Sequence, residues 1–259
     1  MPAITKLRSR DLLDGLKPED EIIPEDKRIE AKDNILEALI KGCERFEEET
    51  TSVATYPLYR LGGDEEAWLI KSILSRLPPF HAKDITQFSQ VFPKVHDKTS
   101  KTRVSGFDEE LVGSYLNACI QRCPENEVLI YSDKCGWRNI GNSNTSKNIL
   151  VRGNLTNAAE NMQGGYLHVE GNINGWAAID MSDGMVYVKG DIYGETGRRM
   201  CGGVIIADGN ASMKVIGHEM TGGVIRINGN RKIRVSQKIR GGVVYHRDQK
   251  VYDGRRVEQ

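Results

Sequence analysis

The chain has 259 residues and carries 36 basic and 36 acidic side chains, so its formal net charge at pH 7 is zero and indicates no particular partner. Its apolar runs stay below the ~18 residues that a membrane-spanning helix needs. The first residues lack the apolar stretch of a secretory signal, and the five scattered cysteines do not form a disulfide framework. These features predict a cytoplasmic protein without membrane segments.

Apolar residues in the first half of the chain recur at steps of three, four and seven, which is typical of amphipathic helices. We expect helices over residues 24–49, 64–77 and 107–122, and a shorter helix near residues 85–91. The second helix would turn Trp68, Leu69, Ile73 and Leu77 inward before Pro78 stops it.

These helices predict a small α-helical domain over residues 1–125, followed by a linker or first strand over residues 126–147. The region is acidic, with 20 basic against 25 acidic residues up to residue 145, and no helix shows the face of a DNA-reading helix. Cys119 and Cys123 lie one turn apart on an apolar face. We therefore interpret them as core residues and not as zinc ligands with Cys135.

Glycines recur through the second half at a nearly constant period. Four of them are the second member of a glycine pair, and Asp183 precedes the fifth. The five positions are Gly165, Gly184, Gly203, Gly223 and Gly242, at steps of 19, 19, 20 and 19 residues. A fixed period near 20 residues predicts a solenoid, in which each repeat is one turn of a coil.

A short segment with period-two alternation follows each of these glycines, as expected of a strand. Two columns of aliphatic residues would point inward: Leu167, Val186, Ile205, Ile225 and Val244, and Val169, Val188, Ala207 and Ile227. The column between them would point outward and is chemically mixed: His168, Tyr187, Ile206, Arg226 and Tyr245.

Further columns keep the same period and support this alignment. Residues 162, 181, 200 and 220 are all methionine, which indicates core packing between successive turns. A further glycine of each repeat is followed by asparagine or aspartate, as in Gly171-Asn172 and Gly190-Asp191. These asparagines and aspartates occupy positions 154, 172, 191, 210 and 230. Such residues tolerate tight turns and hydrogen-bond to nearby backbone, so we interpret this column as a structural polar ladder.

The predicted fold is α+β and mainly β: a parallel β-helix of about six turns over residues 148–259, preceded by the α-helical domain. A solenoid leaves unpaired strand edges at both ends. We therefore expect the helical half, or a partner, to cover at least one end.

The turn from Gly190 to Gly203 reads GDIYGETGRRMCGG, and the next turn keeps Gly209-Asn210 and the run GHEMTGG from Gly217 to Gly223. Over about residues 148–242 this resembles the GXGXG repeat. That repeat is found in the C-terminal domain of the glutamate synthase large subunit and in the C subunit of formylmethanofuran dehydrogenase and its related formyltransferase/hydrolase complex. The resemblance implies a right-handed parallel β-helix that packs beside catalytic neighbours, and it brings no catalytic residue to this chain.

The sequence offers no catalytic site of its own. His218-Glu219 lies at a turn and reads as a solvated pair, and no Gly-x-Ser-x-Gly motif is present. The glycines do not form Gly-x-Gly-x-x-Gly before a helix, so we interpret them as turn residues and expect neither a cofactor nor a metal.

Basic residues are in excess from residue 146 onward, 16 against 11 acidic. Candidate contacts for an acidic partner or an anion are Arg198, Arg199, Arg231, Lys232 and Arg234. The leading hypothesis is a non-catalytic scaffold or interaction subunit of a cytoplasmic complex, acting through a protein partner or self-association. The alternatives are a subunit of an enzyme complex in C1 (formyl) or glutamate/amide-nitrogen metabolism, and a binder of an acidic partner through the basic late turns. Nucleic acid is not an expected partner.

Overall fold

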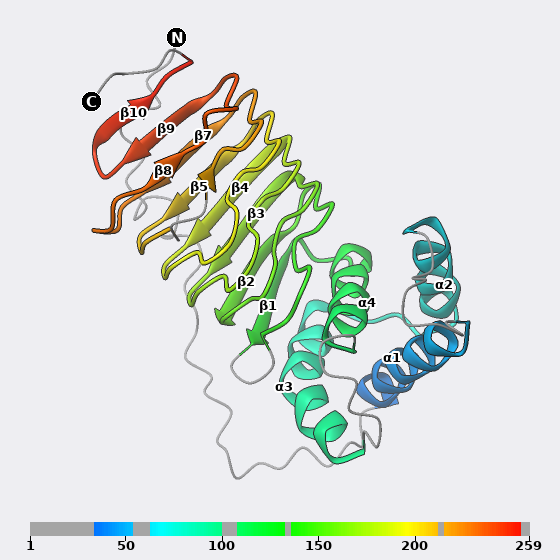
Figure 1. Cartoon of the computed structure of the whole chain (residues 1–259). Helices are drawn as coiled ribbons and strands as arrows, with labels where there is room; N and C mark the ends of the chain where they lie inside the picture. The colour runs from blue at the N-terminus through cyan, green and yellow to red at the C-terminus, as the bar shows by residue number, and fades with distance from the viewer. Residues whose placement is uncertain (1–33, 54–62, 100–107, 133–135, 212–214, 255–259) are drawn as a thin grey trace. The chain divides into compact units, whose positions relative to one another are not determined.

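The computed structural model describes residues 34–53, 63–99, 108–132, 136–211 and 215–254. Four helices come first in the described chain: α1 (Asn34–Val53), α2 (Gly63–Ser75), α3 (Ala82–Thr99) and α4 (Asp108–Arg122) (Figure 1). Ten strands follow: β1 (Glu127–Ser132), β2 (Asn148–Gly153), β3 (Gln163–Val169), β4 (Asp183–Val188), β5 (Val204–Ala207), β6 (Val215–Ile216), β7 (Val224–Ile227), β8 (Arg234–Val235), β9 (Val243–His246) and β10 (Gln249–Tyr252).

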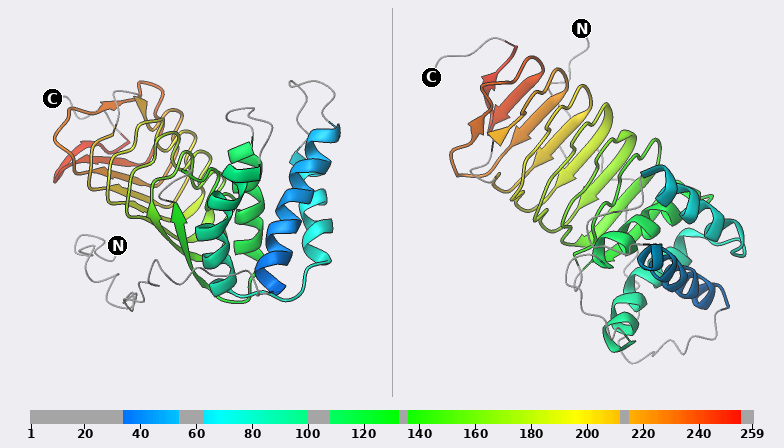
Figure 2. Two further views of the ribbon diagram at one scale, coloured as in Figure 1. Left: turned by 90° about the horizontal axis from the view of Figure 1, so that it is seen from below. Right: turned by 45° about the vertical axis from the view of Figure 1, so that its right-hand side comes forward.

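The strands form a parallel β-solenoid of about six turns over residues 127–246, which confirms the predicted fold class. One sheet has the order β1-β2-β3-β4-β5-β7-β9-β10, and its pairs are parallel except for β9 with β10. Two narrower ladders complete each turn: one runs through Leu155, Ile173 and Ile192, and the other includes Ala177 and Thr196. Figure 2 shows the turns stacked on one another.

The strands pair in the register that the alignment of the sequence repeats predicted. Leu167, Val186, Ile205, Ile225 and Val244 lie on successive strands, and each is fully buried. The predicted methionine column is also fully buried: Met162, Met181, Met200 and Met220. The methionines and the inward aliphatic columns therefore form one continuous core along the solenoid.

The glycines are required by the packing of these methionines. Gly203 has a φ of +81°, and a Cβ there would lie 2.6 Å from the Met181 Cε and 2.8 Å from the Gly184 carbonyl oxygen. Gly223 has the same relation to Met200, at 2.6 Å. Each methionine thus fills the space that the glycine of the next turn leaves open, which explains why the two columns share one period.

The polar ladder joins successive turns. The Asn154 Oδ1 accepts a hydrogen bond from the Asn172 backbone N–H at 2.8 Å, and the Asn172 Oδ1 accepts one from Asp191 at 2.7 Å. The Asp191 Oδ1 accepts from Asn210 at 2.6 Å, and the Asn210 Oδ1 from Arg231 at 2.9 Å. The ladder is structural, as predicted, and each side chain serves the backbone of the following turn.

The buried side chains of the helices include Leu36, Phe46, Phe88, Tyr115 and Leu116, and they belong to the same apolar core as the inward side chains of the solenoid. The helix expected near residues 85–91 is longer, as α3 shows, and the part of the first expected helix before Asn34 lies outside the described residues.

The prediction that Trp68 points inward is wrong, because its side chain is 69% exposed. The buried face of α2 is formed by Leu69, Ile70, Ile73 and Leu74. At ~100° per residue, Trp68 projects from the opposite side of the helix.

The helical region covers the first edge of the solenoid, as expected. Ser89 of α3 accepts a hydrogen bond from the Tyr131 N–H at 3.0 Å through its hydroxyl, and Thr86 donates one to the Leu129 carbonyl at 2.8 Å. These are backbone groups of β1, the first strand of the sheet. At the other end, β10 runs antiparallel to β9. Because β1 lies at Glu127–Ser132, the segment 126–147, predicted to be a linker or a first strand, contains a first strand.

Candidate interaction surface

The eight-stranded sheet has an outer face, formed by the side chains that point away from the solenoid core. The strand register arranges them in three columns. The apolar column consists of Tyr166, Met185, Val204, Val224 and Val243. The mixed column consists of Leu150, His168, Tyr187, Ile206, Arg226 and Tyr245. The charged column consists of Arg152, Glu170, Lys189, Asp208, Asn228 and Arg247.

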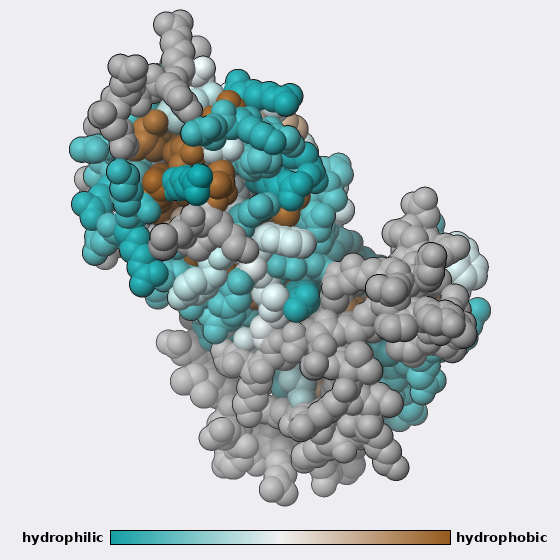
Figure 3. All heavy atoms as spheres, in the orientation of Figure 1, coloured by the Kyte–Doolittle hydropathy of each residue, from teal (hydrophilic) through white to brown (hydrophobic). Residues whose placement is uncertain are grey.

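The apolar column places half-buried side chains on five successive strands of the outer face. On the face seen in Figure 3, hydrophobic residues gather over the C-terminal part of the solenoid among hydrophilic ones. A run of partly exposed apolar side chains on one sheet face can mark a contact with another protein. Sequence reasoning did not single out this column, although period-two alternation places it two residues before the mixed column.

Aromatic rings pack on one another along the mixed column. The ring centroids of His168 and Tyr187 lie 4.9 Å apart, and the Arg226 guanidinium lies 4.6 Å from the ring centroid of Tyr245. His168 and Tyr187 point outward, as expected, yet each is only 7% exposed, and their rings pack against each other. At β3 and β4 the side chains of the mixed column are therefore largely buried, and they adjoin the apolar column.

Burial changes the acid–base properties of this part of the face. It raises the pKa of Tyr166 to about 12. Burial is also the main reason why the pKa of Tyr187 is raised, and the hydrogen bond that the Tyr187 hydroxyl donates to Asp208 acts in the same direction. The pKa of His168 is lowered by burial, and neither ring nitrogen has a hydrogen-bond partner among the described residues, so its neutral form is favoured.

The charged column continues the ladder one residue beyond the strands. The backbone N–H groups of Glu170, Lys189 and Asp208 each donate to the preceding turn at 2.9 Å. Along it the charges alternate in sign on four successive turns, from Arg152 through Glu170 and Lys189 to Asp208. The Arg152 Nε lies 3.6 Å from Glu170, and Asn228 donates to Asp208 at 3.0 Å. One ion pair and one amide–carboxylate hydrogen bond thus link neighbouring turns of this column.

Two of the predicted anion contacts already have carboxylate partners within the chain. Arg199 makes two hydrogen bonds to Asp180, one of them 2.6 Å long, and Arg198 lies 3.3 Å from Glu195. Both arginines lie in the turn between β4 and β5. They fix the corner of this turn to neighbouring carboxylates, which leaves them less free for an external anion.

The other three predicted contacts are Arg231, Lys232 and Arg234, in the segment between β7 and β9. All three are exposed, and none forms an ion pair with a described carboxylate. Of the five predicted anion contacts, two arginines are therefore paired with carboxylates, and three basic residues of a later turn have no described carboxylate partner.

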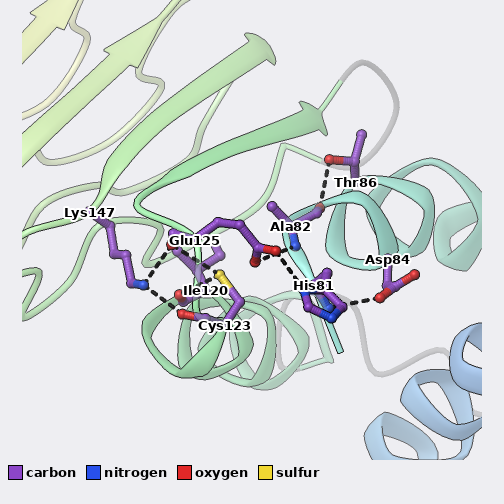
Figure 4. Close-up of polar contacts among 8 residues, drawn as sticks. All are labelled: His81, Ala82, Asp84, Thr86, Ile120, Cys123, Glu125 and Lys147. Carbon is purple, nitrogen blue, oxygen red and sulfur yellow. Dashed lines mark hydrogen bonds and ion pairs between the residues drawn. The ribbon is translucent and has the colours of Figure 1, made fainter. Parts of the chain in front are cut away.

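A polar cluster lies where α3, α4 and the first turn of the solenoid meet (Figure 4). The buried Lys147 donates to the carbonyl oxygens of Cys123 and Glu125 at 2.6 and 2.7 Å, just beyond the end of α4. The Glu125 carboxylate accepts from the Ala82 N–H at 3.0 Å and pairs with His81 at 2.5 Å, at the start of α3. A cation at a helix C-terminus and an anion at an N-terminus are both stabilising. The cluster therefore fastens the helices to the solenoid.

Ser236, His218 and Glu219 form the nearest approach to a catalytic arrangement. The Ser236 hydroxyl lies 3.4 Å from the His218 Nδ1, and the His218 Nε2 lies 3.9 Å from Glu219. However, Ser236 is only 6% exposed and already accepts a hydrogen bond from the Lys238 N–H at 3.0 Å. A nucleophile must reach its substrate, and this hydroxyl is turned into the fold.

The cysteines and acidic groups of the described chain do not form a metal centre. Cys119 and Cys123 are buried, and burial raises the pKa of both thiols, as expected of core residues. Cys135 lies outside the described residues. Among those that are described, no group of three His, Cys, Asp or Glu side chains could hold a metal ion.

None of the helices in the described ranges is long and apolar enough to cross a membrane. Comparison with known protein families, with curated proteins and with solved structures returned no match.

Proposed function

We propose that the protein is a non-catalytic scaffold or interaction subunit, and that the outer face of its sheet binds another protein chain. The observation that carries this proposal is the apolar column, with half-buried side chains from Tyr166 on β3 to Val243 on β9 beside a charged rim. A flat face of this kind suits a protein surface better than a small molecule, because small ligands bind in concave sites.

The most conspicuous repeated residues already have structural roles. The glycines make room for methionines, and the asparagines of the polar ladder bind the next turn. The buried Lys147 is occupied by helix carbonyls. The outward side chains of the apolar column have no comparable role among the contacts of the described residues.

Isolation of the intact chain from its natural source under gentle conditions tests this function. We expect it to run as a species larger than its own mass of 29.0 kDa. Changing Val204 and Ile206 to glutamate should release it, because two charges would be buried in the contact. Arg231→Glu, an exposed change away from the outer face, is the matched control. A native chain that runs at its own mass, with or without these changes, contradicts the proposal.

A second candidate function is binding of an acidic partner by Arg231, Lys232 and Arg234, whose charges have no described carboxylate partner. Such binding would weaken steeply with salt, and Arg231→Glu would then lower affinity while the change at Val204 and Ile206 would not. The same pair of variants therefore separates the two candidates. The enzyme-complex role implied by the GXGXG resemblance stays a prediction.

A further inference from the structure

The alternating charges on the outer face are complementary to themselves. The sequence of signs along the charged column is plus at Arg152, minus at Glu170, plus at Lys189 and minus at Asp208. If a second copy faces this column in the opposite direction, each basic residue can meet an acidic one. Building on the function proposed above, we infer that the partner of the outer face is a second copy of this chain, packed face to face and antiparallel.

Only one register uses all four charges. A two-fold axis parallel to the strands, between β3 and β4, places Glu170 opposite the partner's Lys189 and Arg152 opposite the partner's Asp208. By symmetry each contact occurs twice, as in any isologous interface. The interface would thus contain four ion pairs across the axis.

Other registers lose this match. An axis that coincides with a strand places equal signs opposite each other, so that Glu170 would face the partner's Glu170. An axis between β4 and β5 would bring Arg152 opposite the partner's Arg247. Like charges held directly opposite each other are destabilising, so the register between β3 and β4 is favoured over its neighbours.

The same register brings two apolar pairs together, while Val204 faces the partner's Asn148. It places Leu150 opposite the partner's Ile206, and Tyr166 opposite the partner's Met185. All four side chains are half-buried in the single chain. Packing them together removes apolar surface from water, which is the main driving force of association.

The size of the face indicates a reversible dimer. In this register the four strands β2 to β5 face one another, and at about 4.8 Å per strand their three columns give a contact of roughly 370 Å² in projection. Stable complexes bury about 800 Å² of accessible surface per partner, so this contact lies below that size. We expect the monomer and the dimer to exchange, with a balance that shifts toward the dimer as the concentration rises.

Charge exchange on the purified full chain tests this inference. Glu170→Lys and Lys189→Glu, each alone, place like charges opposite each other at both symmetric contacts. We expect either variant to dimerise at least ~10-fold more weakly than the unaltered chain in sedimentation velocity. An equimolar mixture of the two variants should form a heterodimer, because lysine at 170 and 189 of one chain then meets glutamate at 189 and 170 of the other.

The mixture is decisive because effects within one chain cannot produce rescue between two chains. Arg231→Glu is the control that should leave dimerisation unchanged, and thermal unfolding of each variant checks that the fold is kept. A purified chain that stays at 29.0 kDa at all concentrations, or single variants that do not rescue each other, would overturn the inference. If the chain from its natural source is nevertheless found with a different protein on this face, the proposed function stands and only the identity of the partner is wrong.

Discussion

The two regions of this protein satisfy their backbone groups in different ways. In the solenoid each turn is the hydrogen-bond partner of the next, and side chains such as Asn172 extend that relation to the corners. The helices form their hydrogen bonds within themselves, and they contact the solenoid at the edge of β1 and at the cluster around Lys147. The solenoid repeats one pattern of hydrogen bonds on successive turns. The helices are joined to its first turn by residues that occur only once in the pattern, such as Ser89 and Lys147.

The largest effect is expected where the repeat is most constrained. Gly203→Ala would force a side chain into a left-handed conformation and place its Cβ 2.6 Å from Met181, so we expect a loss of about 3 kcal/mol in the free energy of unfolding. Gly254→Ala is the matched control: its φ is +82°, but nothing lies within 4 Å of a Cβ there, so about 1 kcal/mol should be lost. Equal losses in denaturant titrations would show that the methionine contact does not matter.

The junction between the two regions should be the next most sensitive. Lys147→Met keeps the length of the side chain but removes the donors to the Cys123 and Glu125 carbonyl oxygens, which should cost about 2 kcal/mol. In hydrogen exchange, the substitution should increase the exchange rates of the backbone amides more in α4 than in β4. Lys238→Met, at an exposed position, should change stability by less than about 0.5 kcal/mol. Uniform loosening of both regions would contradict the proposed fastening role.

A smaller effect is expected at the covered edge of β1. Ser89→Ala removes the acceptor of the Tyr131 N–H and should cost about 1 kcal/mol, because that N–H is left without a partner. Exchange of the Tyr131 amide should rise at the same time. Ser75→Ala, an exposed serine that bonds only within its own turn of α2, serves as the control. An unchanged Tyr131 amide would mean that α3 does not protect the edge.

The subtlest effect is a pH dependence within the outer face. Burial lowers the pKa of the folded-state His168, so below its ordinary value of 6.5 the unfolded chain binds a proton that the folded chain does not. Stability should therefore be complete above pH 6.5 and fall as the pH drops from there toward the lowered pKa. Glu170, Asp208 and Lys189 are the charged groups that act on this ring. His168→Gln should remove this part of the dependence in unfolding experiments between pH 7 and pH 5; an unchanged slope would assign it to other groups.

The sequence was most informative where one residue type recurs for one physical reason. The methionines and the glycines that follow them by one turn define the register, because the same contact recurs at Gly184, Gly203, Gly223 and Gly242. Trp68 shows the opposite case: a single apolar residue on a helix has no second copy to confirm its side, and the prediction failed. The fastening by Lys147 and Glu125 joins residues with no shared period, so no pattern in the sequence could reveal it.

The outer face lies between these cases. Its mixed column was found by alternation, whereas the burial of His168 and Tyr187 depends on how their rings pack and cannot be read from alternation alone. The alternating charges were visible in the sequence once the strand register was extended by one residue. Within the chain, Arg152 pairs with Glu170 and Asp208 accepts a hydrogen bond from Asn228, and the dimer inferred above is the prediction that would give these charges a second partner.

The polar ladder helps to locate where the number of residues in a solenoid turn varies. Its successive links join Asn154 to Asn172, Asn172 to Asp191, Asp191 to Asn210 and Asn210 to Arg231, which span 18, 19, 19 and 21 residues. The strands of the main sheet follow nearly the same steps, because Ile149, Leu167, Val186, Ile205 and Ile225 are 18, 19, 19 and 20 residues apart. The extra residues enter after the ladder: Leu155 pairs with Ile173 at 18 residues but Ala158 with Ala177 at 19, and Ile192 pairs with Ala211 at 19 but Thr196 with Ile216 at 20. The segment between the two narrower ladders therefore absorbs differences in length, and residues inserted there would leave the sheet intact. It is the natural place for new sequence to be added without disturbing the surface that the sheet presents.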